Sequence, residues 1–188
     1  MRSRLDDEKR LKEILMQTRS RLQMRLQSSG HVSAAVRAMS YTSPVSRFKD
    51  MTSGIEYYEL VCRLTDHFEE EKSGLIRKLQ GLAAALFCPQ RMLISYTAAR
   101  EGLTGMDEVI AKFKEGLHEG SPAGNMVCLA CEKKNEGFRT ASKVQYVATA
   151  GNFIDAGKEY TGALQILKVI LSYEYLWQNI RVKGGAYG

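Results

Sequence analysis

The sequence predicts an α+β fold in which a helical first part precedes a mixed second part. Apolar residues recur at helical spacing through most of residues 5–87, whereas short β-prone runs appear only after residue 88. A long apolar helical pattern then leads to the end of the chain. We therefore expect a helical unit over residues 1–88 and a strand–helix–strand–strand–helix unit over residues 89–188, with a boundary near residues 87–89.

Helices account for nearly all of the first part. The first is expected over residues 5–29, where no proline interrupts the apolar spacing, and Gly30 offers a stop. A helix of small residues follows, and a break at residues 41–44 leads through a short segment to Gly54. The remaining expectations are helices over residues 55–68 and 72–87. The residues that carry these patterns are Leu11, Ile14, Leu15, Leu22, Leu26, Ala34, Ala35, Ala38, Met39, Tyr58, Val61, Leu64, Leu75, Leu79, Leu82 and Leu86.

The second part combines strands with two helices. Thr104 and Asp107 resemble a capping box that opens a helix to Leu117. The last helix is expected from Thr161 or Gly162 to Ile180. Its buried face would include Leu164, Leu167, Leu171 and Leu176. One strand is expected over residues 91–96, and two or three more are expected around residues 127–131, 137–141 and 144–150.

Composition and charge exclude several classes of protein. The 188 residues carry a net charge of +6, with a pI of about 9.1, but basic and acidic residues are interleaved as on solvated helix faces. Nucleic-acid binding is therefore not expected. The sequence has no apolar run of the roughly 20 residues that a membrane span needs, and residues 1–7 lack the apolar core of a secretory signal.

The four cysteines are expected to be free thiols, because nothing indicates secretion. Cys128 and Cys131 form a lone CxxC in an apolar, strand-like context. A structural zinc site needs about four ligands, and a redox pair favours a helix N-terminus. We therefore interpret these two cysteines as small, buried or half-buried strand residues.

Residues 67–71 come near to a zinc-peptidase motif without completing it. The inverted motif reads His-x-x-Glu-His, and His67 and Glu70 match it, but Glu71 stands where the second histidine belongs. A polar helix end explains this segment better. The sequence therefore predicts no metal ligands and no complete catalytic apparatus in this chain.

The last eight residues combine an arginine, a glycine turn and a tyrosine. Arg181 offers two parallel hydrogen bonds to a carbonyl or carboxylate, and Tyr187 offers a phenolic proton to a developing oxyanion. Gly184 and Gly185 would let the backbone approach a ligand closely. A basic last turn followed by two glycines is also an ordinary helix C-cap, which residue chemistry alone favours.

Several segments, in order along the chain, resemble the presequence-protease, falcilysin-like branch of the insulinase/pitrilysin zinc metallopeptidases. The most specific is the tail, residues 176–188. The others are Ser28-Ser29-Gly30-His31 with Ala34, Ala35 and Arg37; Gly54 with Tyr57-Tyr58-Glu59; and Lys143-Val144-Gln145-Tyr146-Val147 with Gly151-Asn152.

This resemblance implies a LuxS/MPP-like α+β fold within the C-terminal half of a two-half enzyme that encloses and cuts unfolded peptides. Residues 1–88 would end the third domain and residues 89–188 would open the fourth, which would continue past Gly188. Arg181 and Tyr187 would contact the substrate, with Gly184 and Gly185 beside them. The partner would be the N-terminal half, which would hold the zinc, so the chain alone should be inactive.

The alternative to a peptidase part is a non-catalytic peptide-binding or scaffold protein from a truncated gene. Free cysteines and the absence of a signal favour a bacterial cytoplasm, and an organelle is the alternative for a eukaryotic source.

Overall fold

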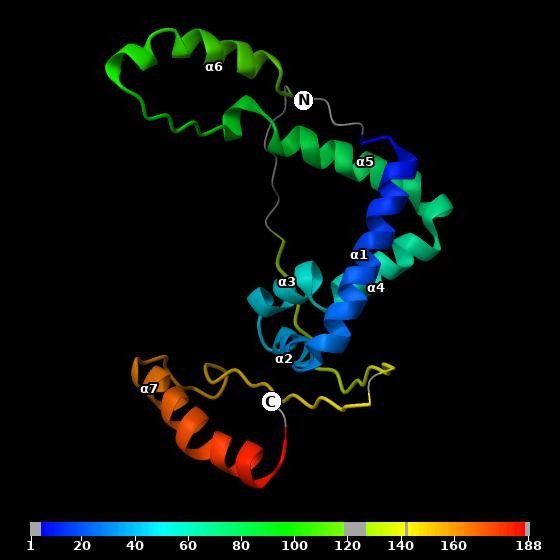
Figure 1. The fold of residues 1–188 in the computed structure, drawn as a ribbon, viewed down its shortest axis with the longest axis vertical. Helices are drawn as coiled ribbons and strands as arrows, with labels where there is room; N and C mark the ends of the chain where they lie inside the picture. Colours follow the sequence, from blue (N-terminus) through cyan, green and yellow to red (C-terminus); the bar gives the residue numbers. More distant parts are fainter. Residues whose placement is uncertain (1–4, 119–126, 142, 187–188) are drawn as a thin grey trace. The chain divides into compact units, whose positions relative to one another are not determined.

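The computed structural model describes residues 5–118, 127–141 and 143–186 (Figure 1). The chain forms two compact units, each built from two stretches of sequence. The first unit comprises Met1–Arg21 and Glu59–Cys128, and the second comprises Leu22–Tyr58 and Leu129–Gly188. In the described part of the chain, no helix is both long and apolar enough to span a membrane.

The first part of the chain is helical, as predicted. Its helices are α1 (Glu8–Ser28), α2 (Gly30–Ser40), α3 (Pro44–Ser53), α4 (Ile55–Asp66) and α5 (Phe68–Leu86). Helix α3 replaces the short connecting segment that was expected before Gly54. The Ser43 side chain caps it by accepting a hydrogen bond from the Ser46 backbone N–H at 3.2 Å, and Pro44 occupies the first turn.

The first unit is organised around the corner between α4 and α5. Lys72 Nζ on α5 lies 2.7 Å from a carboxylate oxygen of Glu8 on α1, and Arg19 on α1 lies 2.6 Å from Asp66. Three buried side chains form its core: Val61, Phe68 and Cys88. The unit also contains the short 3-10 helices η1 (Pro89–Arg91) and η2 (Arg100–Leu103), followed by α6 (Met106–Glu115).

Helix α6 forms where the sequence predicts it, but the capping box is wrong. Gly105 is the N-cap residue, with a φ of 82°, and no side chain caps the helix. Glycine adopts this left-handed conformation at little cost, so the chain turns into the helix one residue after Thr104. Thr104 therefore does not occupy the position from which its hydroxyl would reach the first-turn N–H groups.

The predicted strands are not present among the described residues. Residues 92–99, 127–141 and 144–152, apart from short bends, are irregular rather than assigned to β-strands. A β-strand is defined by a ladder of backbone hydrogen bonds to a neighbour, so a β-prone sequence alone does not produce one. The helical content of the α+β prediction is confirmed, and its sheet is not found in this part of the chain.

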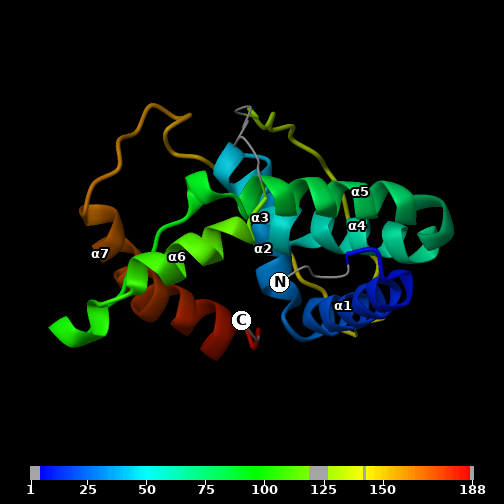
Figure 2. The same cartoon turned by 90° about the horizontal axis from the view of Figure 1, so that it is seen from above.

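The second unit pairs α2 with α3, which lie side by side (Figures 1 and 2). Val36 and Ile55 are buried here, together with the polar side chains of Arg37, Ser40 and Asp50. Residues 129–141 and 143–160 are irregular chain with bends and turns, and α7 (Ala163–Ile170) follows.

Helix α7 continues directly into η3 (Leu171–Lys183), a π-helical stretch, drawn in orange to red in Figure 2. The predicted last helix is confirmed and extends past Ile180 to Lys183. Its predicted buried face is wrong for this structure, because Leu167, Leu171 and Leu176 are 46%, 39% and 41% exposed. An apolar helix face is buried only where a second layer covers it, and here it faces solvent.

Candidate functional site

Helix η3 positions Arg181, the first residue of the predicted C-terminal site. The Arg181 guanidinium carbon lies 4.4 Å from the centre of the Trp177 ring, one helical turn earlier. This cation–π contact holds a planar group with several hydrogen-bond donors against a flat aromatic surface. Arg181 is half-buried, so the Trp177 ring restrains its guanidinium while part of the residue stays accessible to solvent.

The two glycines after η3 form a helix cap. Gly185 has a φ of +65°, and its N–H donates to the Arg181 carbonyl at 3.1 Å, while the Ala186 N–H donates to the Ile180 carbonyl at 3.1 Å. This pattern resembles a Schellman cap widened by one residue, as suits a π-helix. The capping interpretation of Gly184 and Gly185 therefore describes the backbone, and Tyr187 lies outside the described residues.

Substituting Gly185 should test the cap. Gly185→Ala places a side chain in the left-handed region, which costs roughly 1–2 kcal/mol per residue, so the free energy of unfolding should fall by about that amount. Urea denaturation of the whole chain measures it. Gly137→Ala is the matched control, because Gly137 has no positive φ and a Cβ there would meet nothing within 4 Å. Equal effects of the two substitutions would contradict the assigned cap.

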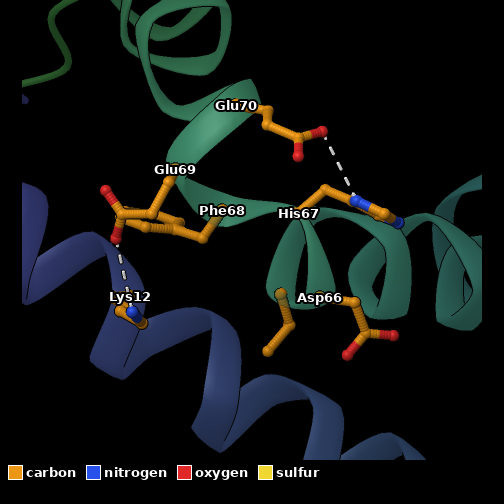
Figure 3. A pocket seen from close by; sticks show the side chains of 7 residues that line it. Lys12, Asp66, His67, Phe68, Glu69 and Glu70 are labelled. Atoms are coloured by element: carbon orange, nitrogen blue, oxygen red, sulfur yellow. Dashed lines mark hydrogen bonds and ion pairs between the residues drawn. The ribbon is translucent and has the colours of Figure 1, made fainter.

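The segment that resembles a zinc motif lines a pocket at the corner between α4 and α5 (Figure 3). Glu69 points toward Lys12, at 3.4 Å, whereas Glu70 turns to His67, at 3.5 Å. Glu71, where a second histidine would be needed, lies 3.7 Å from Arg63. These carboxylates diverge toward basic groups instead of converging on one point, so the segment does not fit a zinc ion.

No group of three or more histidine, cysteine or acidic side chains is arranged to hold a metal anywhere in the described ranges. All four cysteines are free thiols, with Cys88 buried and Cys62 half-buried. Cys128 and Cys131 are both exposed, so the expectation of buried or half-buried strand residues is wrong. The physical reason is that the residues described by the structure form no sheet, so no neighbouring strand or second layer buries these two side chains.

A cluster of polar side chains in the second unit surrounds Arg37, and the sequence did not predict its members. The Arg37 side chain is 9% exposed, and its Nη1 donates to Asp50 at 2.6 Å, whose side chain is fully buried. Its Nη2 and Nε donate to Glu136 Oε1 at 2.7 and 2.9 Å. The Tyr41 hydroxyl also donates to that oxygen.

These contacts shift the pKa values of the groups involved. Burial alone would lower the pKa of Arg37, but its hydrogen bonds to Asp50, Glu136 and Tyr41 outweigh this effect and raise it. Burial likewise would raise the pKa of Glu136, yet the hydrogen bonds from Tyr41 and Arg37 leave it below the ordinary value of 4.5. The Tyr41 pKa is raised by burial and by Glu136. Arg37 and Glu136 are therefore charged at neutral pH.

Two further contacts attach the same irregular segment to the region of α2. The Tyr146 ring lies so close to Gly30 that a Cβ there would meet ring carbons at 2.4 Å, and it is 6.0 Å from the His31 ring. The Asn152 side chain donates to the Thr42 carbonyl at 3.5 Å. Gly30, Arg37, Tyr146 and Asn152 were singled out by the resemblance, and the structure brings them into one unit.

Two models of known families match this chain, one in its first part and one in its last part. Residues 1–64 match the family model described as "Peptidase M16C associated". Residues 135–188 match the model described as "PreP C-terminal domain". The contacts of Arg37 with Glu136, of Gly30 with Tyr146 and of Thr42 with Asn152 each join a residue of one match to a residue of the other.

Curated relatives align along nearly the whole chain. Protein HypA of Clostridium perfringens is 34% identical over 98% of this chain, which corresponds to 19% of that protein. Presequence protease 1, chloroplastic/mitochondrial, of Arabidopsis thaliana is 30% identical over 97% of the chain and 17% of its own length. The mitochondrial presequence protease of Yarrowia lipolytica is 30% identical over 95% of the chain and 18% of its own length.

The chain belongs to the presequence-protease-like M16C peptidases. It spans about a fifth of the length of the curated relatives that it matches. The family resemblance stated from the sequence is thereby confirmed.

Proposed function

We propose that this chain is part of a zinc-dependent endopeptidase that degrades unfolded peptides. It supplies groups that bind the substrate and stabilise the transition state, and the zinc is held by the N-terminal half of the same enzyme. The observation that carries this proposal is the alignment of 97% of the chain with 17% of a presequence protease. The divergent carboxylates around His67 agree with a metal held elsewhere.

The proposed fold in the whole enzyme is LuxS/MPP-like α+β. Residues 1–88 would close one domain and residues 89–188 would open the next. The β-prone segments would then pair with strands from other parts of the longer protein, and the exposed apolar face of α7 and η3 would be covered. A strand needs a neighbouring strand for its backbone hydrogen bonds, and an apolar helix face needs another element to bury it.

The proposed site consists of Arg181 and Tyr187, with Gly184 and Gly185 between them. Arg181 would donate parallel hydrogen bonds to a substrate carbonyl, and Tyr187 would donate its phenolic proton as negative charge develops on the carbonyl oxygen. The turn at Gly184 and Gly185 would let the peptide pass close to the backbone. These four residues provide binding and electrostatic stabilisation, without a nucleophile or a metal ligand.

The proposal is tested by comparing this chain alone with the full-length protein. The full-length protein should hydrolyse an unfolded peptide and contain about one tightly bound zinc per catalytic site, whereas the chain alone should do neither. Hydrolysis of a fluorogenic peptide and metal analysis after dialysis measure both properties. Zinc-dependent cleavage by the chain alone would overturn the proposal that the N-terminal half holds the zinc.

A full-length protein that binds peptides without cutting them would instead support the non-catalytic alternative. A bacterial cytoplasm stays our proposal for the compartment, and relatives named as chloroplastic or mitochondrial make an organelle the alternative.

A further inference from the structure

The Arg37 cluster is built like a receptor for one carboxylate oxygen. Arg37 Nε and Nη2 donate to Glu136 Oε1 at 2.9 and 2.7 Å, and the Tyr41 hydroxyl donates to the same atom. Arg37 Nε also lies 3.1 Å from the Tyr41 hydroxyl oxygen. Three donors from a single helix and its C-cap residue therefore converge on one point.

The two carboxylates around Arg37 have different roles. Asp50 is fully buried and fixed twice, since its Oδ2 binds Arg37 Nη1 at 2.6 Å and its Oδ1 accepts from the Ile55 N–H at 3.0 Å. Asp50 therefore belongs to the framework that orients the guanidinium. The Glu136 side chain is 27% exposed, and the residue lies on an irregular segment, 99 residues from Arg37 in sequence. Glu136 thus occupies the position of a ligand.

We infer that α2 bears a carboxylate-binding site made by Arg37 and Tyr41, with Glu136 as its built-in ligand. Occupation of this site holds residues 136–141 and 143–152 against the α2 region and so joins the two family regions of the chain. When the Glu136 side chain is removed, a small carboxylate such as formate binds in its place. This inference is independent of the proposed peptidase function.

A further carboxylate near this site, Glu56, lies at a different nitrogen of Arg37 and has a partner of its own. Glu56 Oε2 lies 3.7 Å from Arg37 Nη1, and Glu56 is itself paired with Arg47 at 2.7 Å. Removing the Glu136 side chain would therefore leave the Nε and Nη2 groups of Arg37 without the acceptor that they have in this structure. The distances of 2.7 and 2.9 Å from Arg37 Nη2 and Nε to Glu136 Oε1 are those of hydrogen bonds to oxygen, whereas the larger chloride ion would need longer contacts.

Chemical rescue of Glu136→Ala in the whole chain tests the site. Sodium formate should stabilise the variant, and at about 100 times the dissociation constant the ratio of folded to unfolded protein should rise about 100-fold. Thermal unfolding is measured in formate and in chloride at equal ionic strength. Chloride should give little stabilisation, and Tyr41→Phe added to Glu136→Ala should weaken the response to formate.

Glu132→Ala is the matched control, because Glu132 lies on the same segment with an 80% exposed side chain. It should respond to formate no more than the unsubstituted chain does. If formate and chloride act equally on Glu136→Ala, the inference is overturned.

A second variant keeps the test decisive should Glu136→Ala fail to fold. Glu136→Gln retains the side-chain shape but loses the charge, so the segment should detach more often and limited proteolysis should cut within residues 137–141 and 143–152 faster. Glu132→Gln should leave that cleavage rate unchanged. Cleavage of Glu136→Gln as slow as that of the unsubstituted chain would overturn the docking role.

Discussion

Arg37→Met is expected to lower the free energy of unfolding by about 3–5 kcal/mol, because it leaves a buried carboxylate without its counter-charge. Asp50 is fully buried, and Arg37 Nη1 is the cation placed 2.6 Å from it. Methionine fills much of the arginine volume, so the loss reports the missing charge and hydrogen bonds more than a cavity. Urea denaturation followed by circular dichroism measures the change.

Arg10→Met provides the control for this substitution. Arg10 pairs with Glu13 across 3.4 Å, but the two side chains are 62% and 46% exposed. Exposed pairs contribute about 0–1 kcal/mol, so this variant should unfold close to the unsubstituted chain. Asp50→Asn added to Arg37→Met should restore part of the loss, because a neutral amide still accepts from the Ile55 N–H. Equal losses in Arg37→Met and Arg10→Met would refute the role given to buried charge.

Local sequence signals predict most of the helices and miss one. The apolar spacing over residues 5–29 and 55–87 is sufficient, since a helix satisfies its backbone hydrogen bonds within itself. Helix α3 was missed although Ser43-Pro44 carries a serine N-cap followed by proline, which is a recognised start signal. That dipeptide marks the observed start of α3.

The strands illustrate the opposite case. Residues 91–96 and 144–150 are β-prone, but strand formation depends on a neighbouring backbone, which no property of the segment supplies. The same dependence on a partner explains why Leu167, Leu171 and Leu176 are exposed on α7 and η3. An apolar stripe predicts which face will be buried, without predicting what covers it.

The Arg37 cluster lay beyond sequence reasoning for a similar reason. Arg37 and Glu136 are 99 residues apart, so no spacing rule connects them. The resemblance drew attention to Gly30, Arg37, Tyr146 and Asn152, whereas Asp50, Tyr41 and Glu136 carried no local signal. A buried arginine requires acceptors, but only the folded chain shows which of its 21 acidic residues provide them.

Arg181→Ala and Tyr187→Phe in the full-length peptidase should each lower the catalytic rate by about 100- to 1,000-fold, the usual cost of removing one donor to a developing oxyanion. Zinc content should stay unchanged, because neither residue is proposed to bind metal. Trp177→Leu should produce a smaller loss, since it removes the ring 4.4 Å from the Arg181 guanidinium while leaving the arginine in place. Steady-state hydrolysis of an unfolded peptide, with metal analysis of each variant, measures these effects.

Lys183→Ala is the matched control, because Lys183 is an exposed cation in the last turn of the same helix. A general need for positive charge at this helix end would make Lys183→Ala as damaging as Arg181→Ala, whereas a specific substrate contact predicts near-normal rates for Lys183→Ala. Gly185→Ala tests whether the shape of the turn matters by itself, because it strains the turn while keeping both Arg181 and Tyr187. If Arg181→Ala and Tyr187→Phe leave hydrolysis intact, the arginine and the glycine turn serve the helix end alone, and the substrate contact must be sought elsewhere.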